Sequence, residues 1–154
     1  MKTKNKETLI ISLLIPLAVG AVSSLLSGNM MGASSFNQPA LSPPSFLFPI
    51  VWTILYLLMG ISSYLIYTSD SLLKTPALIL YGLQLAFNFF WSILFFHFSL
   101  YEAAFLWLLV MIILIILMIY LFYKVRPLAA YLQVPYLIWC IFAAYLNYMV
   151  YQLN

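Results

Sequence analysis

Long apolar stretches separated by short polar or proline-containing segments make up most of the chain. Residues 108–117 are apolar at every position, which is typical of a helix in hydrocarbon or protein and not of the alternating segments of a membrane barrel. A spanning helix needs about 20 mostly apolar residues, and five stretches meet this requirement: 8–28, 49–67, 77–98, 101–123 and 128–152. The pattern predicts an all-α integral membrane protein, with residues 1–154 forming a single five-helix bundle.

The connections between the predicted spans differ in length. Residues 29–48 form the longest connection and contain Pro39, Pro43 and Pro44 among Ser, Asn and Gln residues. The other connections are short and imply antiparallel neighbours. Long ordered loops are often functional lids, so we expect residues 29–48 to cover one end of the bundle. We also expect the second helix to begin at Pro49, because proline suits the first turn of a helix.

The basic residues all fall at one end of the predicted bundle: Lys2, Lys4, Lys6, Lys74, Lys124 and Arg126. The positive-inside rule then predicts a multi-pass protein of the cell membrane with a cytoplasmic N-terminus and an outer C-terminus. The first span also has features of a secretory signal peptide, since lysines precede an apolar core and small residues lie near Gly20. Its apolar run continues through Leu26, which favours a retained span.

The composition excludes several classes of function. Apolar residues make up 66% of the 154 positions and charged residues 6%, which leaves no soluble catalytic domain and too few basic residues for a nucleic-acid interface. The carboxylates of Glu7, Asp70 and Glu102 lie at predicted helix ends, and His97 has no second ligand at motif spacing. We therefore expect no acid–base centre, no metal site and no cofactor. An ion-driven pump usually has ionisable residues within its spans, and their absence here argues against a pump of that kind.

Polar and aromatic residues share one face in three of the predicted helices. In the third span this face carries Gln84, Asn88, Trp91 and Phe95, with Asn88 near the middle of the bilayer. A carboxamide in hydrocarbon needs a partner helix or a ligand, so the face should point into the bundle. Similar faces occur in the second and fifth spans, with Trp52, Tyr56 and Met59 in one and Trp139, Ala143, Leu146 and Val150 in the other.

Convergence of these faces would form an aromatic cavity that suits a large, flat, mostly apolar molecule. The alternative is that the aromatic residues form interfacial belts and that Asn88 bonds only a neighbouring helix. Small residues four apart also predict close helix contacts, at Gly20, Ser24 and Gly28 in the first span and at Gly82 and Ala86 in the third. These contacts could lie within the bundle or between two copies, and a homodimer through the third span is one hypothesis.

Three blocks of the sequence resemble the tryptophan-rich sensory proteins, also called translocator proteins or peripheral benzodiazepine receptors. The first is Pro43-Pro44 followed by Phe48-Pro49-Ile50-Val51-Trp52, Leu55-Tyr56, Met59-Gly60 and Tyr64. The second is Asn88 with Trp91, Phe95 and Phe96. The third is Pro135-Tyr136-Leu137 with Trp139, Phe142-Ala143, Leu146-Asn147 and Leu153-Asn154. With the five-span spacing these blocks cover nearly the full chain, which resembles a bacterial member of the family.

The resemblance implies a five-helix bundle, often dimeric, that binds porphyrins such as protoporphyrin IX or haem beneath the first loop. Bacterial members are linked to tetrapyrrole sensing, transport or light-dependent porphyrin breakdown. The family's pocket tryptophans correspond to Trp52 and Trp139, and its asparagine in helix three corresponds to Asn88. We therefore expect stacking surfaces, a polar orienting group and neighbouring contacts at the following positions: Trp52, Tyr56, Asn88, Trp91, Phe95, Trp139, Phe142, Ala143 and Leu146.

The chain departs from the family pattern in the first loop and at its end. The family's loop usually reads Lys-Pro-x-Trp-x-Pro-Pro, whereas this chain has Gln38 for the lysine and Leu41 for the tryptophan, which is expected to weaken a contact to an acidic ligand. Residues 146–154 contain no basic residue, so the cholesterol motif of animal members is not carried over. Two other functions stay open: photo-oxidation of bound porphyrin beside Trp52 or Trp139, and passive transport or a scaffold for partner proteins.

Overall fold

The structure, a computed structural model, describes residues 2–26, 42–44 and 46–154. These residues form five long helices and no strand: α1 (Lys2–Leu26), α2 (Leu47–Tyr67), α3 (Lys74–Ser92), α4 (Tyr101–Val125) and α5 (Pro127–Leu153). A π-helical turn, η1 (Ile93–His97), continues α3. The five segments are long and apolar enough to cross a membrane, which confirms the predicted all-α, five-span fold. Most of the predicted lid at 29–48 lies outside the described residues.

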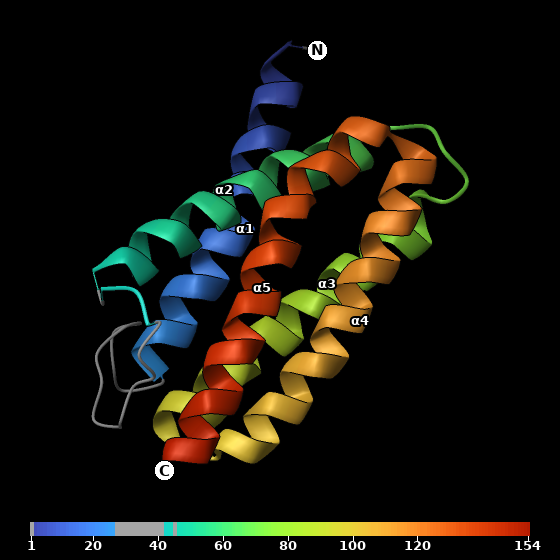
Figure 1. Cartoon of the computed structure of the whole chain (residues 1–154). Helices are drawn as coiled ribbons and strands as arrows, with labels where there is room; N and C mark the ends of the chain where they lie inside the picture. Colours follow the sequence, from blue (N-terminus) through green and yellow to red (C-terminus); the bar gives the residue numbers. More distant parts are fainter. Residues whose placement is uncertain (1, 27–41, 45) are drawn as a thin grey trace.

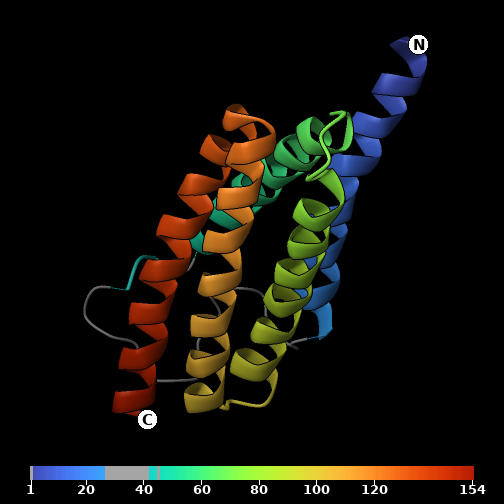
Figure 2. The ribbon, with the colours of Figure 1, turned by 90° about the vertical axis from the view of Figure 1, so that its right-hand side faces the viewer.

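The helices pack side by side in a closed circle. Its order is α1, α2, α5, α4 and α3, and α3 returns to contact α1 (Figures 1 and 2). The chain termini lie at opposite ends of the bundle (Figure 1). α1 begins at the same end of the bundle at which the α2–α3 and α4–α5 connections turn. All six basic residues therefore lie at this end, as predicted. We call this the basic end, and the other the opposite end.

The helix boundaries differ from the predicted spans. α1 begins at Lys2 because the lysine-containing segment continues the helix beyond the apolar stretch. α2 begins at Leu47 and not at Pro49, so Phe48 is helical although it precedes a proline. Pro49 is the third residue of the helix, where no backbone N–H is needed, and Phe48 packs edge-on against Trp139 with ring centroids 5.8 Å apart. The starts of α3 and α5 and the end of α4 move outward by one to three residues.

The third span, predicted at 77–98, runs over Lys74–His97, and within it α3 changes to a π-helical turn after Ser92. The backbone N–H of Phe98 donates to the carbonyl oxygen of Ile93 at 3.1 Å, which is the wider hydrogen-bonding step of a π-helix. This turn keeps Phe95 buried while His97 and Phe98 are exposed. The chain then reverses at Ser99, whose φ of 53° is in the left-handed region.

Two glycines bring α1 close to α2. A Cβ atom at Gly60 would lie 2.7 Å from Cα of Leu13 and 2.8 Å from the carbonyl oxygen of Ser12, and one at Gly20 would overlap the ring of Tyr56. Farther along α1, the hydroxyl of Ser23 donates to the carbonyl oxygen of Phe89 on α3 at 3.1 Å. The small residues of the first span therefore make contacts within the bundle, and α1 is an integral part of it; Gly28 lies outside the described residues.

Candidate ligand-binding site

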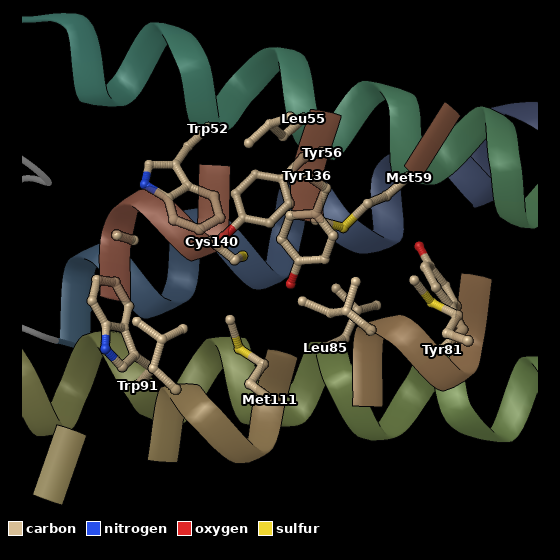
Figure 3. Close-up of a cluster of buried hydrophobic side chains, with 14 of the residues drawn as sticks. Trp52, Leu55, Tyr56, Met59, Tyr81, Leu85, Trp91, Met111, Tyr136 and Cys140 are labelled. Carbon is tan, nitrogen blue, oxygen red and sulfur yellow. The ribbon is translucent and has the colours of Figure 1, made fainter. Parts of the chain in front are cut away.

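Aromatic side chains from α2, α3 and α5 meet inside the bundle. Trp52 is their centre, and its ring centroid lies 5.6 Å from that of Tyr56, 6.5 Å from Trp91, 6.3 Å from Tyr136 and 6.4 Å from Trp139. Figure 3 shows Trp52 and Trp91 pointing toward each other from α2 and α3, with Tyr56 and Tyr136 beside them. We call these five residues the aromatic cluster. Offset and edge-to-face pairs of this kind are the favoured arrangements of aromatic rings.

Buried amides hold the two tyrosines of the cluster. The hydroxyl of Tyr56 donates to Oδ1 of Asn88 at 2.7 Å, and Nδ2 of Asn88 donates to the hydroxyl oxygen of Tyr136 at 3.1 Å. The hydroxyl of Tyr136 donates to Oε1 of Gln84 at 2.6 Å. All four side chains are buried. We call them the amide network, which joins α2, α3 and α5 and fixes the positions of both phenol rings.

A second set of hydrogen bonds lies toward the opposite end. Nε1 of Trp91 donates to Oδ1 of Asn147 at 3.0 Å, and Nδ2 of Asn147 donates to the carbonyl oxygen of Tyr101 at 2.8 Å. Trp91 also stacks on Phe95, with ring centroids 5.4 Å apart. Asn147 therefore joins α3, α5 and the start of α4, and it fixes the indole of Trp91.

The structure places the predicted site residues in three groups. The faces of α2 and α3 point into the bundle as predicted, since Trp52, Tyr56 and Met59 and also Gln84, Asn88, Trp91 and Phe95 are buried. Ala143, Leu146 and Val150 are buried on α5. Trp139 and Phe142 are half-buried at the edge of the cluster, with ring centroids 5.6 Å apart. The three predicted faces thus meet, and on α5 Trp139 is the one residue of the predicted face that stays half-buried.

Sequence reasoning did not assign Tyr136 and Asn147 to the site. Both are almost completely buried and both hydrogen-bond to predicted site residues. The signal for them was the presence of polar groups in an apolar helix at regular spacing, since Gln133, Cys140 and Asn147 are seven residues apart and Tyr136 shares their buried face. The predicted face of α5 overlaps the buried one at Ala143, Leu146 and Val150.

Open volume lies beside the aromatic cluster, because its rings fill the space between the three faces. A cavity of about 260 Å³ between α1 and α2 is lined by the following residues: Leu17, Gly20, Ala21, Ser24, Pro49, Trp52, Thr53 and Tyr56. An apolar groove of about 620 Å³ lies on the other side, between α2 and α5, and is lined by Val51, Ile54, Leu55, Leu58, Val134, Pro135, Ile138, Trp139 and Phe142. We call the first of these the Trp52 cavity.

The polar groups at the site are amides, hydroxyls and indole N–H groups. Such groups orient a ligand through hydrogen bonds and carry no charge. Within the described ranges, no three His, Cys, Asp or Glu side chains come together as metal ligands. His97 is exposed at the opposite end, and Cys140 is buried next to the aromatic cluster (Figure 3). Aromatic and aliphatic walls with a few neutral polar groups are typical of pockets for mostly apolar molecules.

Comparison with known proteins gives a match to the TspO/MBR family over residues 12–153. The chain belongs to this family. It is 32% identical to the tryptophan-rich protein TspO of Archaeoglobus fulgidus, in an alignment that covers 97% of this chain and 99% of the relative. It is 33% identical to the tryptophan-rich sensory protein of Cereibacter sphaeroides, over 78% of this chain and 75% of the relative.

A mammalian relative extends the comparison. The chain is 34% identical to the translocator protein of Sus scrofa, over 92% of this chain and 86% of the relative. The resemblance inferred from the three sequence blocks is therefore confirmed. Together with the five spanning helices, membership of the TspO/MBR family identifies a multi-pass membrane protein related to proteins with sensory and translocator names.

Proposed function

We propose that this member of the TspO/MBR family binds a flat, mostly apolar ligand of the porphyrin class at the aromatic cluster. The observation that carries the proposal is the meeting of five aromatic rings from three helices on a network of buried amides, beside a cavity that Trp52 and Tyr56 line. Aromatic faces bind flat rings by stacking. Binding of this kind precedes sensing, transport and photo-oxidative breakdown alike.

The ligand enters on the side of the cluster that faces α1. There the Trp52 cavity is walled by the small residues Gly20, Ala21 and Ser24, so a flat molecule can approach the ring of Trp52 closely. A tetrapyrrole is larger than about 260 Å³, so binding requires this cavity to widen. Asn88 is not part of the cavity wall. It acts by holding Tyr56, which does line the cavity, through the hydrogen bond from the Tyr56 hydroxyl.

Protoporphyrin IX added to the detergent-solubilised full chain is expected to quench tryptophan fluorescence saturably. Trp52→Phe is expected to weaken binding roughly two- to tenfold, the range that an aromatic contact contributes. Trp139→Phe is expected to weaken it less, because Trp139 does not line the Trp52 cavity and acts through its contact with the ring of Trp52. The matched control is Trp107→Phe, because Trp107 stacks on Phe87 at 4.2 Å and donates to its carbonyl oxygen, away from the cluster. Absence of saturable quenching, or equal affinity in all these variants, would contradict the proposal.

We infer that two copies associate through α3. Gly82 lies on the outer surface, and a Cβ atom there would meet nothing within 4 Å. Its neighbours on the exposed side of α3 are Ile79, Leu83, Ala86 and Phe90. Small residues four apart on a lipid-facing helix allow the close approach of a second helix.

Gly82→Ile is expected to convert the dimer into a monomer, because the larger side chain separates the two helices. The mass of the protein–detergent complex, measured by light scattering, checks this. Ala18→Ile is the control, since it adds similar bulk to an exposed position on α1. An unchanged mass of the Gly82 variant would exclude this interface.

We infer that the basic end lies in the cytoplasm. All six basic residues gather at this end, together with two of the three carboxylates, and the positive-inside rule counts the basic residues. A reporter that is active only in the cytoplasm is expected to give a signal when fused before Met1 and none when fused after Asn154. The reverse result would invert the orientation.

A further inference from the structure

A second pocket lies between α1, α2 and α3 near the basic end, apart from the aromatic cluster. Its volume is about 350 Å³, and its wall is formed by Thr8, Ile11, Ser12, Ile15, Ser63, Tyr67, Leu78 and Tyr81. Thr8, Ser12, Ser63, Tyr67 and Tyr81 carry hydroxyl groups, and the other three residues are aliphatic. We call it the hydroxyl pocket. None of its residues lines the Trp52 cavity or the groove between α2 and α5.

The packing of α1 explains why space is left here. α1 is seated on α2 where Leu13 meets Gly60, and it bonds to α3 toward the opposite end, where Ser23 donates to Phe89. Nearer the basic end the N-terminal part of α1 runs out beyond the other helices (Figure 2). Thr8, Ser12 and Ile15 of α1 form one wall of the pocket there.

One hydroxyl of this pocket has no good partner within the bundle. Tyr81 is 7% exposed, and its hydroxyl points toward α2 in Figure 3. That oxygen lies near Ser63 but forms no hydrogen bond of good geometry in the described part of the chain. Ser63 instead donates to the carbonyl oxygen of Gly60 at 3.0 Å. A buried hydroxyl in a membrane needs a partner, so Tyr81 is a donor available to an occupant of the pocket.

Positive charge lies at the mouth of the pocket. The ammonium group of Lys74 lies 4.7 Å from the ring centroid of Tyr67, which forms part of the pocket wall. Lys6 precedes Thr8 by two positions on α1. The carboxylates at this end belong to Glu7 and Asp70, both exposed, against six basic residues. The charge balance therefore favours an anionic group at the mouth.

We propose that the hydroxyl pocket binds an anionic phospholipid of the surrounding bilayer. The phosphate lies beside Lys74, an ester carbonyl oxygen accepts a hydrogen bond from the hydroxyl of Tyr81, and the upper part of one acyl chain lies along Ile11, Ile15 and Leu78. The charge at the mouth suits the phosphate of such a lipid, and farther in the wall interleaves hydroxyl groups with the aliphatic side chains that contact the acyl chain. The rest of the lipid stays in the bilayer.

Native mass spectrometry of the full chain tests this proposal. The protein is equilibrated with equal amounts of phosphatidylglycerol and phosphatidylcholine that carry the same acyl chains. The wild type is expected to retain phosphatidylglycerol preferentially, and Lys74→Gln is expected to lower the retained ratio roughly fivefold. The matched control is Lys124→Gln, because Lys124 lies 5.4 Å from the ring centroid of Tyr120 in the same kind of contact at the same end, outside the pocket.

A second variant separates the hydroxyl contact from the charge. Tyr81→Phe keeps the ring and removes the hydroxyl, so retention of both lipids is expected to fall together while the ratio stays, because both carry the same ester groups. Circular dichroism and thermal unfolding are expected to match the wild type. No preference in the wild type, equal loss in the two lysine variants, or unchanged retention in Tyr81→Phe would overturn the proposal.

Discussion

Alanine in place of Gly60 is expected to destabilise the bundle by about 1–3 kcal/mol, the usual cost of overpacking a filled core. The added Cβ atom would lie 2.7 Å from Cα of Leu13 and 2.8 Å from the carbonyl oxygen of Ser12. Both are backbone atoms, so relief requires α1 to move as a whole and not a side chain to rotate. The free energy of unfolding, measured by denaturant titration of the full chain in detergent micelles, checks the result.

Gly82→Ala is the matched control for this prediction. It makes the same chemical change inside a spanning helix, and within one copy the new methyl group meets nothing within 4 Å. Both glycine variants are therefore compared at a detergent-to-protein ratio at which the chain is monomeric. Because alanine favours the helix over glycine by about 1 kcal/mol, this variant is expected to be neutral or slightly more stable. Opposite signs at the two glycines would show that α1 is seated on Gly60, whereas equal effects would contradict that packing.

The fold and most of the three site faces follow directly from local sequence. A run of about 20 apolar residues has few alternatives to a spanning helix, and this fixed the five helices to within a few residues. Trp52, Tyr56, Asn88 and Trp91 could be placed inside because polar and aromatic groups on one face of an apolar helix need partners. Periodicity within a single helix was sufficient for these assignments.

The face of α5 was predicted only in part by the same reasoning, since Ala143, Leu146 and Val150 are buried as predicted but Trp139 is not. Trp139 was predicted to face inward as a large aromatic residue, but in the structure it lies half-buried at the edge of the groove between α2 and α5. The larger side chains of α5 that enter the core and were not predicted to do so are Gln133, Tyr136, Cys140 and Asn147. In an apolar helix the polar positions predict the buried face better, because exposing a polar group to lipid costs more free energy than placing an indole at the membrane interface.

The open volumes lie beyond what the sequence reveals. A cavity depends on how far apart neighbouring helices stand, and that distance is set by contacts such as Gly20 with Tyr56 and Gly60 with Leu13 between different helices. The sequence showed that Gly20 belongs to a small-residue ridge without showing which surface meets it. For the same reason it predicted one hollow between three faces, where the structure has rings in contact and space on both sides.

Leucine in place of Asn88 is expected to destabilise the protein by about 1–3 kcal/mol. The change removes the acceptor of the Tyr56 hydroxyl and the donor to the Tyr136 hydroxyl, both in the buried interior. Tyr136 keeps its bond to Gln84, so Tyr56 loses more. The free energy of unfolding of Asn88→Leu, Tyr56→Phe and the double variant gives the coupling between the two residues, which we expect to be about 0.5–2 kcal/mol.

Tyr64→Phe is the control for this cycle, because Tyr64 lies on the same helix outside the amide network. Its effect is expected to add to that of Asn88→Leu within about 0.5 kcal/mol. If the Tyr56 cycle is also additive, the hydrogen bond to Asn88 contributes nothing to stability. Tyr56 lines the Trp52 cavity and Asn88 does not. We therefore expect Asn88→Leu and Tyr56→Phe to lower the affinity for protoporphyrin by a similar factor, with no further loss in the double variant. This result would show that Asn88 acts on the ligand through the position of Tyr56.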